Sequence, residues 1–305
     1  MAQVPIDDVR SALERRATGL GFAEDRSARL ADHFLDAEMR GATGHGAERM
    51  RWLHRLPGLR PDARPAEADR REGYVRYDAG GALGYLALAE VLDAELADPP
   101  AGARLVVVSD CFPTGRLGYF AEMGAAAGLL TLLTATSTAR IVHPAGGPPV
   151  AGTNPLCLAS PGDPPAVIDV SMGAVTYGAV LKAAATGTSM RPGTLLRDDG
   201  TPELDPAEVI ADRAGIAPFG GELAHKGFAL ALLVEVLCTS LAGDAGHAAV
   251  ALLARPEADG MAAIRPLLAG RRAPGESGRR RLEETVRSGV MELPDDLWEW
   301  LSGPH

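Results

Sequence analysis

The sequence predicts an α/β protein with a helical N-terminal part and no Rossmann dinucleotide unit. Apolar residues in the first third recur at the three-to-four-residue spacing of amphipathic helices. From Tyr74 onward, short β-branched runs alternate with helical patterns. No G-x-G-x-x-G motif follows a strand, and no acidic residue stands ~20 residues beyond one, as a dinucleotide-binding turn requires. A standard nucleotide-binding fold is therefore not supported.

The first third is expected to hold three helices. The expected segments are a helix capped by Asp7 or Asp8 and reaching Leu20, a second helix from Glu24 to Met39, a loop over 42–46, and a third helix through Met50 and Leu53. Gly41 is expected to end the second helix. The Pro- and Arg-rich stretch from Pro57 to Arg71 is the expected flexible connection to the α/β region.

The remainder reads as strands and helices in alternation. Strands are expected at Tyr74–Tyr77, Leu105–Ser109, Leu129–Thr134, Leu156–Ala159, Ala166–Val170 and Ala248–Leu253. Helices are expected at Gly81–Leu96, Arg116–Ala127, Ala174–Ala185, Leu223–Leu241, Arg279–Ser288 and Asp295–Leu301. The Pro- and Gly-dense residues 144–155 are expected to form a loop.

Composition excludes several classes of protein. The net charge of −10 argues against a nucleic-acid surface. The longest apolar runs, such as Phe228 to Leu237, are about ten residues, so no membrane span is expected. Three widely spaced cysteines form no metal motif and favour reduced thiols, and the N-terminus lacks a secretory pattern. We therefore expect a cytoplasmic protein.

Short motifs occur in a fixed order across nearly the whole chain. They are Met39-Arg40-Gly41-Ala42-Thr43-Gly44-His45-Gly46 with Arg49 beyond it, Asp78-Ala79-Gly80-Gly81-Ala82-Leu83-Gly84, Gly152-Thr153-Asn154-Pro155, Ile168-Asp169-Val170, Gly220-Gly221 with Lys226-Gly227-Phe228-Ala229-Leu230, and Pro274-Gly275-Glu276. Together they resemble the type-two malate/L-lactate dehydrogenase family, which includes ureidoglycolate dehydrogenase and piperideine-2-carboxylate reductase. Each motif alone is weak, whereas the ordered set is specific.

The resemblance implies a non-Rossmann fold in which N-terminal helices pack beside a mixed sheet. It implies an NAD(P)-dependent oxidoreductase that uses NADPH or NADH on a small carboxylated substrate, a 2-oxo or 2-hydroxy acid or a cyclic imine. It also implies a homodimer with a shared cleft. The expected division is an N-terminal helical segment with a substrate loop (1–72), a cofactor- and substrate-binding core (73–270) and a C-terminal helical segment (271–305).

His45 and Arg49 are the expected catalytic pair. Four residues separate them, so a helix starting at His45 would present both on one face. Arginine can bind a carboxylate through two hydrogen bonds, and an imidazole can donate a hydrogen bond or proton to the adjacent oxygen or nitrogen. An ordinary surface histidine is the alternative.

Cofactor contacts are expected from the residues that match the remaining motifs. These are Ser137, Thr153, Asn154, Ser171, Met172, Gly173, Lys226, Gly275 and Glu276. Turn formation is the alternative for Thr153 and Asn154, and simple solvation is the alternative for Lys226. No metal site is expected, because His33, His45 and His54 have no ligand spacing.

The chain departs from the family at one point that matters for the chemistry. The family's N-x-N-H-F-G segment, whose His is the proton acceptor in ureidoglycolate dehydrogenase, corresponds to residues 110–115 and places Pro113 at that His. Proline cannot transfer a proton. A protonated cyclic iminium needs no acid, so imine reduction is affected less than ketone reduction. A relative with non-redox chemistry or a silent binding protein is the alternative, which nicotinamide binding would distinguish.

Overall fold

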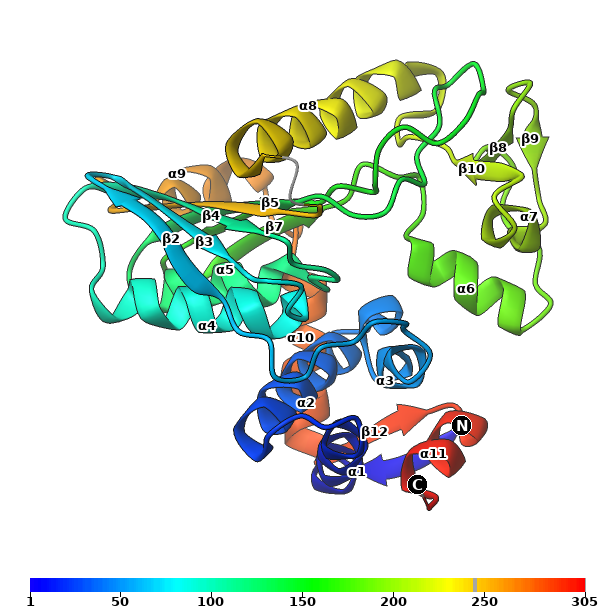
Figure 1. Cartoon of the computed structure of the whole chain (residues 1–305), viewed down its shortest axis with the longest axis horizontal. Helices are drawn as coiled ribbons and strands as arrows, with labels where there is room; N and C mark the ends of the chain where they lie inside the picture. The colour runs from blue at the N-terminus through cyan, green and yellow to red at the C-terminus, as the bar shows by residue number, and fades with distance from the viewer. Residues whose placement is uncertain (244–245, 305) are drawn as a thin grey trace.

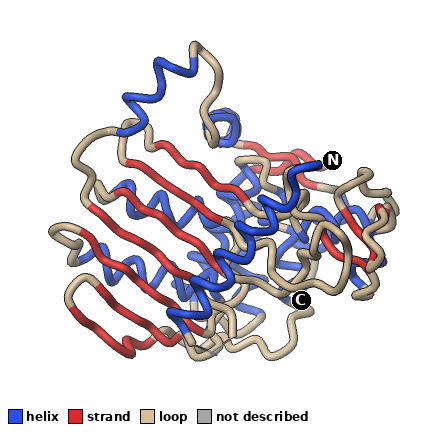
Figure 2. Tube along the Cα trace, turned by 90° about the horizontal axis from the view of Figure 1, so that it is seen from above, coloured by secondary structure: helices blue, strands red, loops and turns tan. Residues whose placement is uncertain are grey.

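In the computed structural model, which describes residues 1–243 and 246–304, a seven-stranded sheet runs through the centre of the fold (Figure 1). Its spatial order is β2 (Ala66–Arg71), β3 (Tyr74–Asp78), β4 (Ala103–Ser109), β11 (Ala249–Ala254), β5 (Leu130–Ala135), β6 (Leu156–Ser160) and β7 (Ala166–Val170). The β3–β4 pair is parallel and every other neighbouring pair is antiparallel. Figure 2 shows these strands side by side. The predicted mixed, non-Rossmann sheet is confirmed.

Helices cover both faces of this sheet. On one face, α4 (Gly84–Ala97) and α5 (Leu117–Ala126) bury a core with alternate residues of β4 and β11, such as Val106 and Ala251. On the other face lies α8 (Ala224–Ala242), whose Val234 and Cys238 pack on Val107. Successive strand residues point to opposite faces, so the apolar strand β11 and the apolar run 105–108 of β4 can pack against both helix layers.

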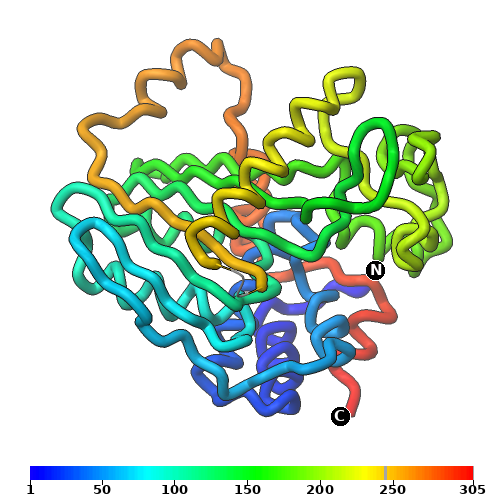
Figure 3. The backbone as a smooth tube through the Cα atoms, turned by 45° about the horizontal axis from the view of Figure 1, so that its top comes forward, coloured from blue at the N-terminus to red at the C-terminus, as the bar shows by residue number. Residues whose placement is uncertain are grey.

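The two ends of the chain share one core. The helices α1 (Ile6–Gly19), α2 (Glu24–Met39) and α3 (Glu48–Leu53) pack with β12 (Val290–Leu293) and α11 (Asp295–Ser302). Strand β1 (Ala2–Pro5) pairs with β12 in antiparallel register, and α10 (Glu276–Ser288) leads into this body. The blue and red ends lie together in Figure 3. The three-part division of the chain stays a prediction.

A small lobe stands beside the sheet. It consists of α6 (Tyr177–Ala185), α7 (Pro206–Ile210) and a three-stranded sheet of β8 (Leu195–Arg197), β9 (Pro202–Glu203) and β10 (Ala214–Ile216). An isolated bridge between Ile141 and Ile216 ties this lobe to the segment that follows β5. A short α9 (Gly260–Ile264) and a 3₁₀ turn, η3 (Arg265–Leu268), precede α10.

Most predicted elements are confirmed to within a few residues, and three expectations are wrong. Residues 66–71 of the expected flexible connection form β2, because pairing with β3 satisfies the backbone of this polar segment. Neither Asp7 nor Asp8 caps α1, which begins at Ile6 after Pro5 without a side-chain cap. The helix expected from Ala174 begins at Tyr177, where the Thr176 side chain accepts from the Ala179 N–H.

The apolar helix α8 lies where the helix Leu223–Leu241 was expected, and its apolar character extends beyond the run Phe228 to Leu237. By length and composition alone, residues 221–242 could cross a membrane. One such helix is a weak indication, because a helix that packs on a folded core passes the same test. Here Gly227, Ala231 and Val234 form a buried stripe at helical spacing.

Candidate active site

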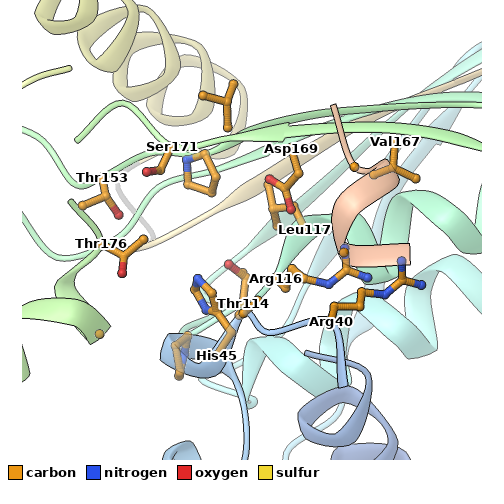
Figure 4. A pocket seen from close by; sticks show the side chains of 18 of the residues that line it. Arg40, His45, Thr114, Arg116, Leu117, Thr153, Val167, Asp169, Ser171 and Thr176 are labelled. Carbon is orange, nitrogen blue, oxygen red and sulfur yellow. The ribbon is translucent and has the colours of Figure 1, made fainter. Parts of the chain in front are cut away.

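A cavity of about 1250 Å³ lies where the N-terminal helices, the β7 end of the sheet and the small lobe meet. Figure 4 shows side chains from all three regions entering it. Ligand pockets commonly measure ~300–1,000 Å³, so this one has room for a dinucleotide beside a small substrate. Eight of the eleven residues expected at the site line it: His45, Arg49, Ser137, Thr153, Ser171, Gly173, Gly275 and Glu276.

His45 and Arg49 enter the cavity from two separate short helices. His45 ends the 3₁₀ turn η1 (Thr43–His45), Gly46 is extended, and α3 begins at Glu48. The expectation of one continuous helix is therefore wrong, because extended Gly46 interrupts it. Arg49 nevertheless folds back, and its Nε donates to the Gly44 carbonyl at 2.7 Å. This bond holds the guanidinium beside the His45 turn.

The small lobe closes against the same turn. A Cβ at Gly178 of α6 would lie 2.6 Å from the Gly44 oxygen and 2.9 Å from Arg49 Nη2. Both distances are too short for a real Cβ, so glycine at 178 allows this approach. Residue 178 lay outside the motifs, and nothing in the sequence marked its role.

The imidazole of His45 is held in its neutral form. Burial lowers its pKa from 6.5 to about 3, and the positive charges of Arg49 and Arg116 act in the same direction. A neutral imidazole keeps one N–H donor and one acceptor nitrogen. At pH 7 His45 can thus donate a hydrogen bond to a substrate oxygen or nitrogen, but its imidazolium form is scarce.

A half-buried ion-pair cluster, which no sequence motif indicated, forms the wall beside α5. Arg116 bonds the Asp36 carboxylate through Nε at 3.0 Å and Nη2 at 2.6 Å, and Arg40 Nε reaches the other Asp36 oxygen at 2.8 Å. Glu122 accepts from Arg40 at 2.7 Å. Arg40 and Arg116 both line the cavity, as Figure 4 shows. Four charged residues that lie between positions 36 and 122 carried no local signal.

Asp169 points into the cavity from β7 (Figure 4). Its carboxylate accepts from the Gly118 N–H at 2.8 Å. Burial raises the pKa of Asp169, and the Gly118 hydrogen bond and the Arg116 charge only partly offset this. A Cβ at Gly118 would fall 2.1 Å from Arg116 Nη1, which explains the glycine there.

The Gly-Thr-Asn-Pro motif has one residue that stabilises the fold, Asn154, and one that lines the cavity, Thr153. Asn154 is fully buried with a positive φ of 35°, which asparagine tolerates better than most residues. Its amide accepts from the Ser137 N–H at 3.3 Å and donates to the Ala231 carbonyl at 3.0 Å and Glu235 at 2.7 Å. Asn154 thus joins three segments, while its neighbour Thr153 faces the cavity (Figure 4).

The remaining expected cofactor contacts fall into two groups. Ser171 and Gly173 line the cavity, and Glu276 lines it while its carboxylate accepts from the Ala273 N–H at 2.9 Å. Met172 is buried in the core, and Lys226 is exposed on the first turn of α8 outside the lining. Their roles stay predictions, as do those of the residues that line the cavity.

The donor set of the cavity suits a nicotinamide nucleotide. Hydroxyls of Ser137, Thr153, Ser171 and Thr176 can bond ribose and amide groups, and the guanidinium of Arg265, which forms an ion pair with Glu276 at 2.7 Å, is a further donor on the cavity wall. Among residues 1–243 and 246–304, no group of three or more His, Cys, Asp or Glu side chains is arranged to hold a metal ion.

Fold and cavity together define a class: an α/β protein without a Rossmann unit, whose cavity has room for a dinucleotide beside a small ligand. Residues 4–272 match the malate/L-lactate dehydrogenase family. The chain belongs to that family and is therefore an oxidoreductase, and the family's dehydrogenases and reductases use NAD(P)H.

Named relatives cover most of the chain. It is 32% identical over 259 residues to a Δ1-pyrroline-2-carboxylate/Δ1-piperideine-2-carboxylate reductase of Pseudomonas putida, which spans 81% of this chain and 72% of the relative. It is 29% identical over 298 residues to an L-sulfolactate dehydrogenase of Methanothermobacter thermautotrophicus, spanning 92% and 84%.

Solved structures agree on the fold. A dehydrogenase from Sinorhizobium meliloti superposes with a TM-score of 0.86 at 27% identity, covering 99% of this chain and 97% of the other. The Δ1-piperideine-2-carboxylate reductase from Pseudomonas syringae gives 0.83 at 24% identity, covering 99% of each chain.

Proposed function

We propose that this protein transfers hydride between NAD(P)H and a small carboxylated substrate, either a 2-oxo acid or a cyclic imine carboxylate. The observation that carries this is the placement of Arg49 beside His45 on one cavity wall, with Thr153 and Ser171 on another. The P. putida relative, named as an imine carboxylate reductase, supports the imine substrate class.

Each residue of the pair has a distinct proposed task. The Arg49 guanidinium holds the substrate carboxylate, a charge-assisted contact of roughly 1.5–3 kcal/mol. Neutral His45 donates its N–H to the carbonyl oxygen or imine nitrogen and so polarises the double bond. When bound, the nicotinamide supplies or accepts the hydride.

We propose that the cofactor is held by Ser137, Thr153, Ser171 and the Gly275–Glu276 turn. Gly275 has a φ of 83°, and a Cβ there would lie 2.3 Å from the Val167 carbonyl, so the turn approaches β7 closely. Asn154 and Met172 then act from behind the wall by holding its backbone.

A screen of purified protein tests this function. Pyruvate, oxaloacetate, Δ1-pyrroline-2-carboxylate and Δ1-piperideine-2-carboxylate would each be offered with NADH and with NADPH, and oxidation of the cofactor followed by absorbance. Turnover of at least one pair is expected. A protein that binds neither cofactor in calorimetry and turns over none of these substrates would contradict the proposal.

We infer further that the protein is a cytoplasmic homodimer. The outer face of α8 carries Leu233 and Val236 with 56% and 64% of their surface exposed. Beside it, a row of paired residues crosses four strands on the same face of the sheet: Leu252, Leu132, Leu158 and Ile168. Contiguous apolar surface of this kind commonly marks a protein interface. A monomeric mass by light scattering at micromolar concentration would contradict the dimer.

A further inference from the structure

Tyr85 is a buried phenol whose hydroxyl has no hydrogen-bond partner among the residues that the structure describes. It lies in the first turn of α4 and only 2% of its surface is exposed. None of the hydrogen bonds formed within residues 1–243 and 246–304 involves its oxygen. In that part of the chain, every fully buried side-chain nitrogen or oxygen that lacks a hydrogen-bond partner belongs to an Arg or a His. The Tyr85 oxygen is not among them, so this oxygen retains some exposed surface. Tyr85 is one of the residues that line the cavity, so the cavity is the open space that its hydroxyl can face.

Packing fixes the ring of Tyr85 against residues 113–115, where this chain has Pro113 and the family resemblance predicts a histidine. A Cβ at Gly115 would lie 2.2 Å from Tyr85 Cε1, so the ring lies directly against that glycine. Gly84 also lies close to the Pro113 carbonyl, where a Cβ would stand 2.7 Å from the oxygen. The His33 ring, 4.9 Å away, supports Tyr85 from α2. The phenol is held in place by contacts that do not use its hydroxyl.

The ionisable groups around Tyr85 keep it protonated. Burial raises the pKa of the phenol, and the Arg49 charge only partly offsets that rise. Burial also lowers the pKa of His33, so its imidazole is neutral. The His33 Nε2 accepts a hydrogen bond from the backbone N–H of Arg116 at 3.2 Å. At pH 7 Tyr85 is therefore a phenol with an O–H to donate, placed on the same cavity as Arg49 and His45.

The other acidic groups that face this part of the cavity already accept hydrogen bonds from the protein. Glu122 is engaged by Arg40, and Asp169 accepts from the Gly118 N–H. His45 is scarcely protonated at neutral pH. Pro113 has no proton to give.

We propose that Tyr85 is a catalytic proton donor, whose hydroxyl gives its proton to the substrate oxygen or nitrogen that gains an electron pair on reduction. This inference rests on the proposed function. When the carbonyl carbon of a 2-oxo acid gains a hydride supplied by NAD(P)H, the π pair of C=O moves to oxygen. That oxygen takes the phenol proton, the Tyr85 O–H bond breaks, and water reprotonates the phenolate through the open cavity.

The test compares Tyr85→Phe with Tyr119→Phe. Tyr119 contacts the same His33 ring, at 4.6 Å, but its hydroxyl bonds Arg29 and the residue does not line the cavity, so it controls for the loss of a tyrosine hydroxyl outside the site. Tyr85→Phe removes an oxygen that has no protein partner, so the melting temperature is expected to stay within a few degrees of wild type. With a 2-oxo acid, kcat is expected to fall about 10²–10⁴-fold, as for loss of a general acid, while KM rises no more than about tenfold because Arg49 still holds the carboxylate. Tyr119→Phe should match wild type.

A cyclic imine substrate gives a second, sharper readout. At pH values where the imine arrives already protonated, Tyr85→Phe should match wild type. Its kcat/KM should fall below wild type once the pH exceeds the substrate's own pKa. A rate equal to wild type at every pH, or a uniform loss at every pH, would overturn the proposal.

Oxamate binding separates this inference from the proposed function. Oxamate presents a carboxylate beside a carbonyl, and its affinity for the NADH-loaded protein is measurable by calorimetry without turnover. Loss of one hydrogen bond predicts an affinity about two- to tenfold weaker in Tyr85→Phe. If wild type is inactive on every substrate, the proposed function fails, and oxamate still decides whether the hydroxyl faces the ligand. Equal affinity in wild type and Tyr85→Phe overturns the Tyr85 contact alone. If Tyr85→Phe does not fold, a fluorinated tyrosine at position 85 should shift the alkaline limb of the pH profile downward.

Discussion

Two walls of the cavity differ in how far their residues match the family's motifs. The wall over residues 43–49 keeps both the imidazole and the guanidinium, and Arg49 is bonded to the Gly44 carbonyl in place. The wall over residues 110–116 has a close-packed glycine at 115 but carries Pro113 at the position where the family resemblance predicts a histidine. Glycine contacts can thus persist where the reacting group has changed. Packing and chemistry are separate constraints on the same segment.

The largest expected effect is on the wall that keeps its chemistry. His45→Ala should lower kcat about 10²–10⁴-fold, because the neutral imidazole no longer polarises the reacting double bond. Steady-state kinetics on the native substrate would measure this, with His225→Ala, an exposed position on α8, as the control. Undiminished turnover would mean that His45 has a structural role and takes no part in the reaction.

On the other wall the expected effect is on stability. Gly115→Ala should lower the free energy of unfolding by about 3 kcal/mol, because the new Cβ meets the Tyr85 and His33 rings at 2.2 and 2.4 Å and φ is 74°. Gly128→Ala has a similar φ of 79° with nothing within 4 Å of the Cβ, so it should cost only about 1 kcal/mol. Equal losses in urea titrations would show that conformation rather than contact explains glycine at 115.

Arg49→Ala sharpens the comparison by separating binding from chemistry. Loss of the carboxylate contact should reduce kcat/KM about ten- to a hundredfold, mainly through KM. Affinity for NADH or NADPH, measured separately by fluorescence, should change little. Arg15→Ala, at an exposed position of α1, provides the control. A loss confined to kcat would contradict a carboxylate-binding role.

A smaller effect, on the pH dependence of stability, is expected at Glu38, which packs against residues 46–47 of the first wall. Its carboxylate accepts from the Ala47 N–H at 2.9 Å and packs against Gly46, and burial raises its pKa from 4.5 to about 7. Between pH 4.5 and 7 the unfolded chain releases this proton while the native state retains it. Stability from this group is therefore full below pH 4.5 and is lost as the pH rises toward 7.

Glu38→Gln keeps an acceptor for Ala47 and removes the titration. Relative to wild type, the variant should gain about 2 kcal/mol on going from pH 5 to pH 8, from 1.36 kcal/mol per pKa unit with allowance for partial exposure. Urea unfolding at the two pH values measures the difference. Parallel pH dependence in both proteins would show that the Glu38 carboxylate is not perturbed.

Local signals were sufficient for the elements and for the motif residues. The helical spacing through Leu30 and Phe34 and the β-branched run 105–109 indicated elements that the structure confirms. These patterns are determined by residues near in sequence, because burial of one helix or strand face imposes its own period. The ordered motifs were likewise enough to indicate the family and eight residues of the cavity.

Contacts between distant segments required the tertiary structure. Residues 66–71 read as a linker and became a strand only by pairing with β3. The Arg116–Asp36 pair spans 80 residues, and the buried, unpartnered Tyr85 hydroxyl exists only because α2, α4 and residues 113–115 converge on it. Burial, electrostatic shifts such as that of His45, and free hydrogen-bonding capacity are properties of a three-dimensional neighbourhood. No spacing along the chain encodes them.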